Sequence, residues 1–181
     1  MALATFLALA AAVAARPASA DGSLEYPVKA TYLYKFAPFV QWPAAAFESA
    51  SSPFAICVVG ADPFGQALDQ AVASQRVEAH PIVVKRLAKV DRSSGCHVVY
   101  LGGGKGESTS DVLAAVRGTP VLTVSDSGHD GVKGVIDFQI RDNRVRFAID
   151  DQAAQLNGLV ISSKLLSLAV AVRLRSPEAA K

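Results

Sequence analysis

The sequence predicts an α/β fold: a mainly parallel mixed sheet covered by helices on both faces, with a C-terminal antiparallel hairpin and a final helix. Three observations support this prediction. The 181 residues are 51% hydrophobic and 19% charged, which suits a globular domain and excludes a disordered chain. Short apolar runs alternate with helical patterns over most of the chain, as in a parallel sheet that is buried on both faces. Two later segments alternate apolar and polar residues, as in a hairpin with one exposed face.

The first 20 residues are expected to form a signal peptide rather than part of the fold. Residues 2–15 are apolar apart from Thr5, and Ala18-Ser19-Ala20 fits the small-residue pattern of a cleavage site. The segment has no polar face, which argues against an amphipathic helix, and its apolar run is short for a membrane span. We therefore expect an exported protein with one domain over residues 21–181.

The first half of the domain is expected to begin with a helix over residues 28–40, in which Val28, Tyr32 and Phe36 share one stripe at helical spacing. A strand at 54–60 precedes a helix that should begin at Asp62-Pro63, because Asp is a favoured N-cap and Pro suits the first helical turn. The remaining expected elements are strands at 81–85, 96–101 and 121–124, and a helix around 111–117 that ends at Gly118.

The last third of the chain predicts a hairpin over residues 134–141 and 144–149, joined by a two-residue turn at Asp142-Asn143. In this register six apolar residues point to one side of the hairpin, in the facing pairs Ile136 and Ile149, Phe138 and Phe147, and Ile140 and Val145. The other side carries Asp137, Gln139, Arg141, Arg144 and Arg146. A final helix is expected over 162–173, capped by Ser162 or Ser163.

The cysteine count and the charge limit the classes of partner. Lys and Arg number 18 against 16 Asp and Glu, so the charge does not indicate binding to nucleic acid. Two cysteines are too few for a four-thiolate metal site. In an oxidising compartment, Cys57 and Cys96 in two apolar strands are expected to form a disulfide that closes a loop of about 40 residues. Two reduced core cysteines are the alternative.

No template for catalysis, cofactor binding or metal binding fits the chain. Residues 102–109 follow a strand and precede a helix, but they lack the order of a phosphate-binding loop. Ser125, Asp126 and His129 are triad residue types within one short loop, whereas triads converge from separate elements. His80, His97 and His129 lack the spacing of metal ligands. We therefore expect a protein without catalytic residues, a cofactor or a metal.

Three arginines, Arg141, Arg144 and Arg146, are expected to converge on the polar side of the hairpin. Two interpretations stay open. The cluster can be a solvated edge, or it can bind a carboxylate or phosphate group, which the guanidinium matches in fork geometry.

Six blocks, in order along residues 27–172, resemble the YfiR family. The blocks are VKATYLYKF (28–36) with VQWP (40–43), FAICVVGADPFG (54–65), CHVVY (96–100), PVLTVSD (120–126), NRVRF (143–147) and LVISSKLL (159–166).

The resemblance implies a non-enzymatic periplasmic protein that represses a membrane diguanylate cyclase by binding its periplasmic domain. Such a repressor controls cyclic di-GMP signalling and biofilm formation, and an outer-membrane peptidoglycan-binding lipoprotein can sequester it. The best-known member carries two disulfides, and Cys57 and Cys96 match one of those pairs. A homodimer stays open.

A second function class, a periplasmic small-ligand binder, also stays open. Its crevice would be formed by the loops 60–65, 102–106 and 125–128 at the carboxyl ends of parallel strands, where such folds bind ligands. Leu33 of the first helix is expected to be accessible. The candidate residues for ligand or partner contact are Arg141, Arg144, Arg146, Ser125, Asp126 and Tyr34.

Overall fold

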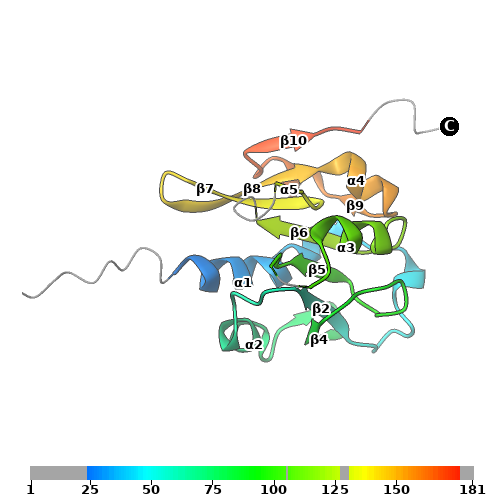
Figure 1. The fold of residues 1–181 in the computed structure, drawn as a ribbon. Coiled ribbons are helices and arrows are strands. Elements are labelled where there is room, and N and C mark those ends of the chain that lie inside the picture. Colours follow the sequence, from blue (N-terminus) through cyan, green and yellow to red (C-terminus); the bar gives the residue numbers. More distant parts are fainter. Residues whose placement is uncertain (1–23, 105, 127–130, 176–181) are drawn as a thin grey trace, which may run out of the picture.

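The computed structural model describes residues 24–104, 106–126 and 131–175, so the expected signal peptide lies outside the described residues. An eight-stranded mixed sheet runs through these residues (Figure 1). In spatial order its strands are β10 (Ala171–Arg173), β8 (Arg144–Asp150), β7 (Ile136–Arg141), β6 (Leu122–Asp126), β5 (Val98–Leu101), β2 (Phe54–Val59), β4 (His80–Leu87) and β3 (Arg76–Val77).

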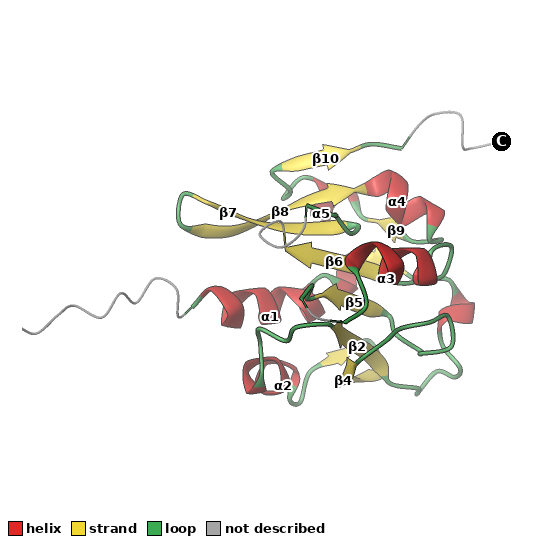
Figure 2. Cartoon of the chain, viewed as in Figure 1, coloured by secondary structure: helices red, strands yellow, loops and turns green. Residues whose placement is uncertain are grey.

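The centre of the sheet is parallel, as predicted, because the strands β4, β2, β5, β6 and β7 pair in parallel. Every residue of β2 is buried, which explains its continuous apolar sequence. Ile56 and Val58 belong to one core with α1 (Glu25–Lys35) and α2 (Gln66–Val72). Cys57 and Val59 point to a second core with α3 (Thr109–Val116) on the opposite face. Helices therefore cover both faces of the sheet (Figure 2).

The C-terminal hairpin has the predicted register. Ile136 pairs with Ile149, Phe138 with Phe147, and Ile140 with Val145. Asp142 and Asn143 form the turn with φ of 49° and 56°, the left-handed values of a two-residue hairpin turn. Two helices follow, α4 (Asp151–Leu156) and α5 (Ser163–Leu166), and β1 (Val40–Gln41) pairs with β9 (Val160–Ile161) in a separate antiparallel ladder.

The first helix is shorter than predicted, and its inward face differs from the prediction at one position. It ends at Lys35, and a 3₁₀ turn over Ala37–Phe39 leads into β1. Val28 is 40% exposed, whereas Lys29 beside it is fully buried. Tyr32 and Phe36 of the predicted stripe pack in the first core, whereas Val28 lies outside it. Lys29 takes the inward position in its place, and sequence periodicity scores a charged residue as a surface residue.

The expected helix over 162–173 is wrong. Ser162 caps α5, but this helix covers only Ser163–Leu166, and residues 171–173 form β10 instead. This strand pairs in parallel with β8, so the open edge of the hairpin selects strand over helix for a short apolar run.

Asp62 does not cap a helix either. α2 begins four residues later, at Gln66, with Gly65 as its N-cap at a φ of 48°. The Oδ1 atom of Asp62 accepts hydrogen bonds from the backbone N–H groups of Phe64, at 2.8 Å, and Gly65, at 3.2 Å. Asp62 therefore forms the turn that leads into the helix rather than the helix end.

Candidate functional site

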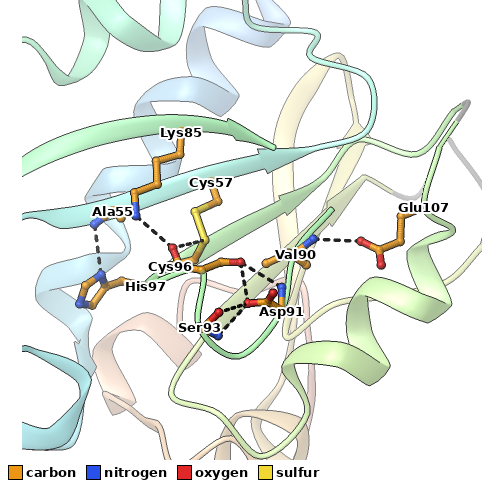
Figure 3. The surroundings of a disulfide bond; sticks show 10 residues. Ala55, Cys57, Lys85, Val90, Asp91, Ser93, Cys96, His97 and Glu107 are labelled. Carbon is orange, nitrogen blue, oxygen red and sulfur yellow. Dashed lines mark hydrogen bonds between the residues drawn. A yellow bond between two sulfur atoms is a disulfide. The ribbon is translucent and has the colours of Figure 1, made fainter. Parts of the chain in front are cut away.

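A disulfide joins Cys57 of β2 to Cys96, which lies two residues before β5 (Figure 3). The two Cα atoms are 5.9 Å apart, within the range of about 7 Å that a disulfide spans. Cys57 is fully buried, and Cys96 is 9% exposed. The bond packs with Val99, Val112 and Val116 under α3, so it tethers two neighbouring strands inside the second core.

The three arginines of the hairpin lie on one polar face, as expected. Arg141 is the register partner of Arg144, and Arg146 is the partner of Gln139. All three side chains are exposed, and among the described residues no carboxylate lies within ion-pair distance of them. Only Arg141 has a side-chain partner in this part of the chain, since its Nε donates to Oε1 of Gln139 at 3.1 Å.

Three other arginines of the described chain are neutralised by carboxylates, whereas Arg76, Arg92 and Arg117 are single exposed arginines without an ion pair in this part of the chain. Arg86 pairs with Asp62 and Asp69, Arg173 with Asp150, and Arg175 with Asp151. The contrast sets the polar face of the hairpin apart: it concentrates three cations without a matching acid in the described chain. Arg141, Arg144 and Arg146 are called the arginine face below.

Ser125 is a buried structural residue of β6. Its hydroxyl donates to Oδ1 of Asp137 at 2.8 Å and accepts from the backbone N–H of Gly134 at 3.0 Å. Asp137 was expected on the exposed side of the hairpin, but it is only 2% exposed. Ser125 and Lys133 both contact its carboxylate. His129, the third residue of the triad types, lies outside the described residues.

Asp126 ends β6 beside a buried cation that sequence analysis missed. The ammonium of Lys29 donates to Oδ2 of Asp126 and, at 2.5 Å, to Oε1 of Glu25. It also lies 5.2 Å from the centre of the Tyr26 ring and 5.8 Å from that of Phe138. Asp126 therefore connects α1 to the sheet in this structure. A lysine at i+4 from a glutamate was the available signal, but such pairs are usually solvated.

Electrostatics hold Lys29 in its charged form. Burial alone would lower the pKa of this ammonium, because it disfavours the charge. The hydrogen bonds and negative charges of Asp126 and Glu25 outweigh the burial and raise the pKa of Lys29 above its ordinary value. Nearby, burial raises the pKa of Tyr100, and the charge of Asp126 adds to the effect.

Tyr34 and Leu33 of α1 differ in their exposure to solvent. Tyr34 is half-buried against the first core, so part of its ring remains accessible. Leu33 is fully buried, which contradicts the expectation that it is accessible. The structure therefore leaves Tyr34 as the one of the two that a partner could contact.

Two of the loops expected to form a strand-end crevice pack against each other. The backbone N–H of Ala61 donates to the carbonyl of Gly103 at 2.9 Å. A Cβ atom on Gly102 would lie 1.9 Å from the carbonyl oxygen of Ala61, so glycine is required for this contact. Residues 105, 127 and 128 of the expected crevice lie outside the described residues. The glycines of these loops therefore allow backbone packing.

A cavity of about 440 Å³ lies at the other end of the sheet, where β2, β5 and β6 begin. Lys85, Arg92, Cys96 and His97 are among its lining residues. His97 is buried and stacks between Phe47 and Phe54, with ring centres 4.6 Å and 4.8 Å away (Figure 3 shows His97 with Ala55). Burial lowers the pKa of His97, so its ring is neutral near pH 7.

The described residues hold no cluster of three or more His, Cys, Asp or Glu that could bind a metal ion. No helix in this part of the chain is long and apolar enough to cross a membrane. The described chain is therefore an α/β protein with two distinctive features. One is the buried disulfide between two neighbouring strands, and the other is the exposed arginine face.

The family comparison identifies the class of protein further. The YfiR/HmsC-like family model matches residues 26–170, and the chain belongs to this family. At the level of the family, its members are periplasmic regulatory proteins that interact with a signalling partner. Among curated proteins, no sequence matches this chain.

Proposed function

We propose that the protein is an exported, non-enzymatic repressor that docks on the periplasmic domain of a membrane diguanylate cyclase. Membership of the YfiR/HmsC-like family over residues 26–170 is the observation that carries this proposal. Repression by contact lowers cyclic di-GMP and restrains biofilm formation. An outer-membrane peptidoglycan-binding lipoprotein, by holding the repressor away from the cyclase, would release the enzyme.

The arginine face is the proposed docking surface for the cyclase. Arginine binds carboxylates in charge-assisted pairs, and a surface with three unneutralised cations favours an acidic partner. Tyr34 is a further candidate contact. Ser125 and Asp126 have internal partners, so we propose that they act by shaping the β6 end that supports the face.

A gene-deletion experiment tests the proposal. Deleting the gene should raise cellular cyclic di-GMP, and supplying the wild-type protein to the periplasm should lower it again. The double variant Arg144→Ala/Arg146→Ala should fail to restore the low level. Arg76→Ala, an exposed arginine of β3 at the opposite edge of the sheet, serves as the matched control and should restore it. Unchanged cyclic di-GMP in the deletion strain, with the cyclase expressed, would refute the repressor function.

Export and assembly have separate tests. We propose cleavage after Ala20, and N-terminal sequencing of the periplasmic protein should therefore begin at Asp21. A homodimer would appear in analytical ultracentrifugation as a sedimenting species of twice the mass of the mature chain. An uncleaved cytoplasmic protein would contradict the proposed compartment.

A further inference from the structure

A hollow of about 350 Å³ lies between α3, α4 and the segment that leads into β7. Its lining contains none of the residues of the arginine face, and the proposed repressor function does not rest on it. Its lining is mainly apolar, with Val116 and Val135 at 1% exposure forming the floor and Leu113 and Leu156 nearer the surface. Its volume falls in the range of pockets that hold small molecules.

The walls of this hollow are held in place by polar contacts. Nδ2 of Asn157 donates to the carbonyl of Val121 at 3.0 Å, and Oδ1 of Asn157 accepts from the N–H of Gly118 at 3.0 Å. These bonds join the end of α4 to the end of α3. On the third side, the N–H of Val135 donates to Oγ1 of Thr123 at 2.9 Å. A pocket that exists before binding loses less ordering entropy when a ligand enters it.

The charged residues that line the hollow are both cations, Arg117 and Lys133. Both side chains reach solvent, since Arg117 is exposed and the side chain of Lys133 is 58% exposed. Arg117 has no carboxylate within ion-pair distance in the part of the chain that the structure describes. The ammonium of Lys133 lies 3.7 Å from Oδ2 of Asp137, a long contact with a carboxylate that Ser125 already holds.

We infer that this hollow binds a small amphipathic carboxylate. The apolar tail lies against Leu113, Val135 and Leu156, which removes their exposed surface from water. The carboxylate meets Lys133 and Arg117, whose charges complement its own. A cationic amphiphile of equal length would fill the same apolar floor but meet two like charges. The sign of the ligand's charge should therefore determine which of two amphiphiles of equal length binds more tightly to the hollow.

The inference is tested by isothermal titration calorimetry on the purified, disulfide-bonded protein without any partner, so the result does not depend on the repressor proposal. Octanoate is the probe, and octyltrimethylammonium is the matched probe of opposite charge. We expect octanoate to saturate one site and octyltrimethylammonium to bind at least tenfold more weakly. In NMR spectra, octanoate should shift the amide signals of residues 113–117 and 132–135.

Two sets of variants locate the binding. Arg117→Ala/Lys133→Ala should weaken octanoate binding at least tenfold, and Leu113→Asn should weaken it about fivefold. The control Arg76→Ala/Lys89→Ala removes one exposed arginine and one exposed lysine outside the hollow and should leave binding unchanged. Circular dichroism and melting curves confirm that each variant is folded. No saturable octanoate binding, equal binding of the two probes, or unchanged binding in Arg117→Ala/Lys133→Ala would overturn the inference.

Discussion

Positive charge lies against both faces of the C-terminal hairpin, but it is buried on one face and exposed to solvent on the other. Under α1, Phe138 and Phe147 pack with Tyr32 and Phe36, and the one cation among them, Lys29, is buried between two carboxylates. On the other face, the arginine face is exposed and meets no carboxylate in the described chain. The second core under α3 contains no residue of β7 or β8.

This difference separates cations that hold the fold from cations that are available to a partner. A buried charge is tolerated only when it is paired, so Lys29 acts with Asp126 and Glu25 as part of the structure. Exposed arginines add little to stability and retain their capacity to pair with another molecule. Substitutions on the α1 side should therefore change stability, and substitutions on the arginine face should change binding.

The largest effect is expected from Phe36→Ala. Phe36 is 1% exposed, and its ring centre lies 5.1 Å from that of Phe147 and 5.9 Å from that of Phe138. Removing the ring leaves a cavity and should lower the free energy of unfolding by about 3–5 kcal/mol. Urea denaturation measures the change. A decrease of less than 1 kcal/mol in the free energy of unfolding would show that packing between Phe36 and the hairpin contributes little to stability.

The second largest effect on stability is expected from removal of the disulfide. This change also tests whether the two faces of the hairpin depend on a bond that lies in the second core. Cys57→Ala/Cys96→Ala removes the bond that closes a loop of 39 residues, and stability should fall by roughly 3–4 kcal/mol on the chain-entropy model. Both hairpin faces should keep their structure, as judged by amide NMR signals of β7 and β8. Mass spectrometry of the non-reduced wild type should find no free thiol, and two free thiols would contradict the disulfide.

Lys29→Met breaks the buried ion cluster while keeping most of the side-chain volume. Asp126, whose side chain is 10% exposed, then loses its buried cation, and stability should fall by about 3 kcal/mol. Adding Asp126→Asn should recover part of the loss, because it removes the negative charge that Lys29 stabilised. Lys35→Met, at an exposed position of the same helix, is the control and should change stability by less than about 0.5 kcal/mol.

Alkaline pH should remove the contribution of Lys29 in a defined direction. The folded protein raises the pKa of Lys29, so its stabilisation is complete below the ordinary lysine pKa of about 10.4 and is lost as the pH rises through the folded value. The stability difference between wild type and Lys29→Met should be constant from pH 7 to about 10 and shrink above it. A difference that instead disappears on acidification toward pH 7 would contradict the assigned direction.

The smallest effect on stability is expected on the arginine face. Arg144→Ala/Arg146→Ala should change the free energy of unfolding by less than about 0.5 kcal/mol, because both side chains are exposed and removal of Arg144 also relieves its repulsion with Arg141. Thermal melts at low salt measure this. A loss of several kcal/mol would mean that this face is structural too, and the comparison would fail.

Sequence patterns predicted the elements whose side chains follow a simple period. The strand over β2, the hairpin register and a serine cap at 162 or 163 were all visible, since continuous burial, strict alternation and capping are local properties. Parts of the site were visible for the same reason: alternation alone placed Arg141, Arg144 and Arg146 on one side. The cysteines were expected to pair because both were predicted to lie in core strands. The structure contains that bond, although Cys96 lies two residues before β5.

Lys29 and β10 could not be predicted in this way. Burial of Lys29 depends on Asp126, 97 residues further along the chain, so no window of sequence contains both partners. β10 forms only because β8 offers an open edge, whereas its short apolar run suits a helix equally well. The hollow between α3 and α4 also lacks a local signal, because its lining residues come from separate segments that only the fold brings together.

The sequence by itself determined the class of fold, the order of most elements and the side of the hairpin that carries the arginines, because each follows from the spacing of apolar and polar residues along the chain. The tertiary structure decided which charges are buried and which remain available. That outcome depends on whether a carboxylate from a distant segment comes within reach: Asp126 does so for Lys29, and in the described chain no acid does so for the arginine face.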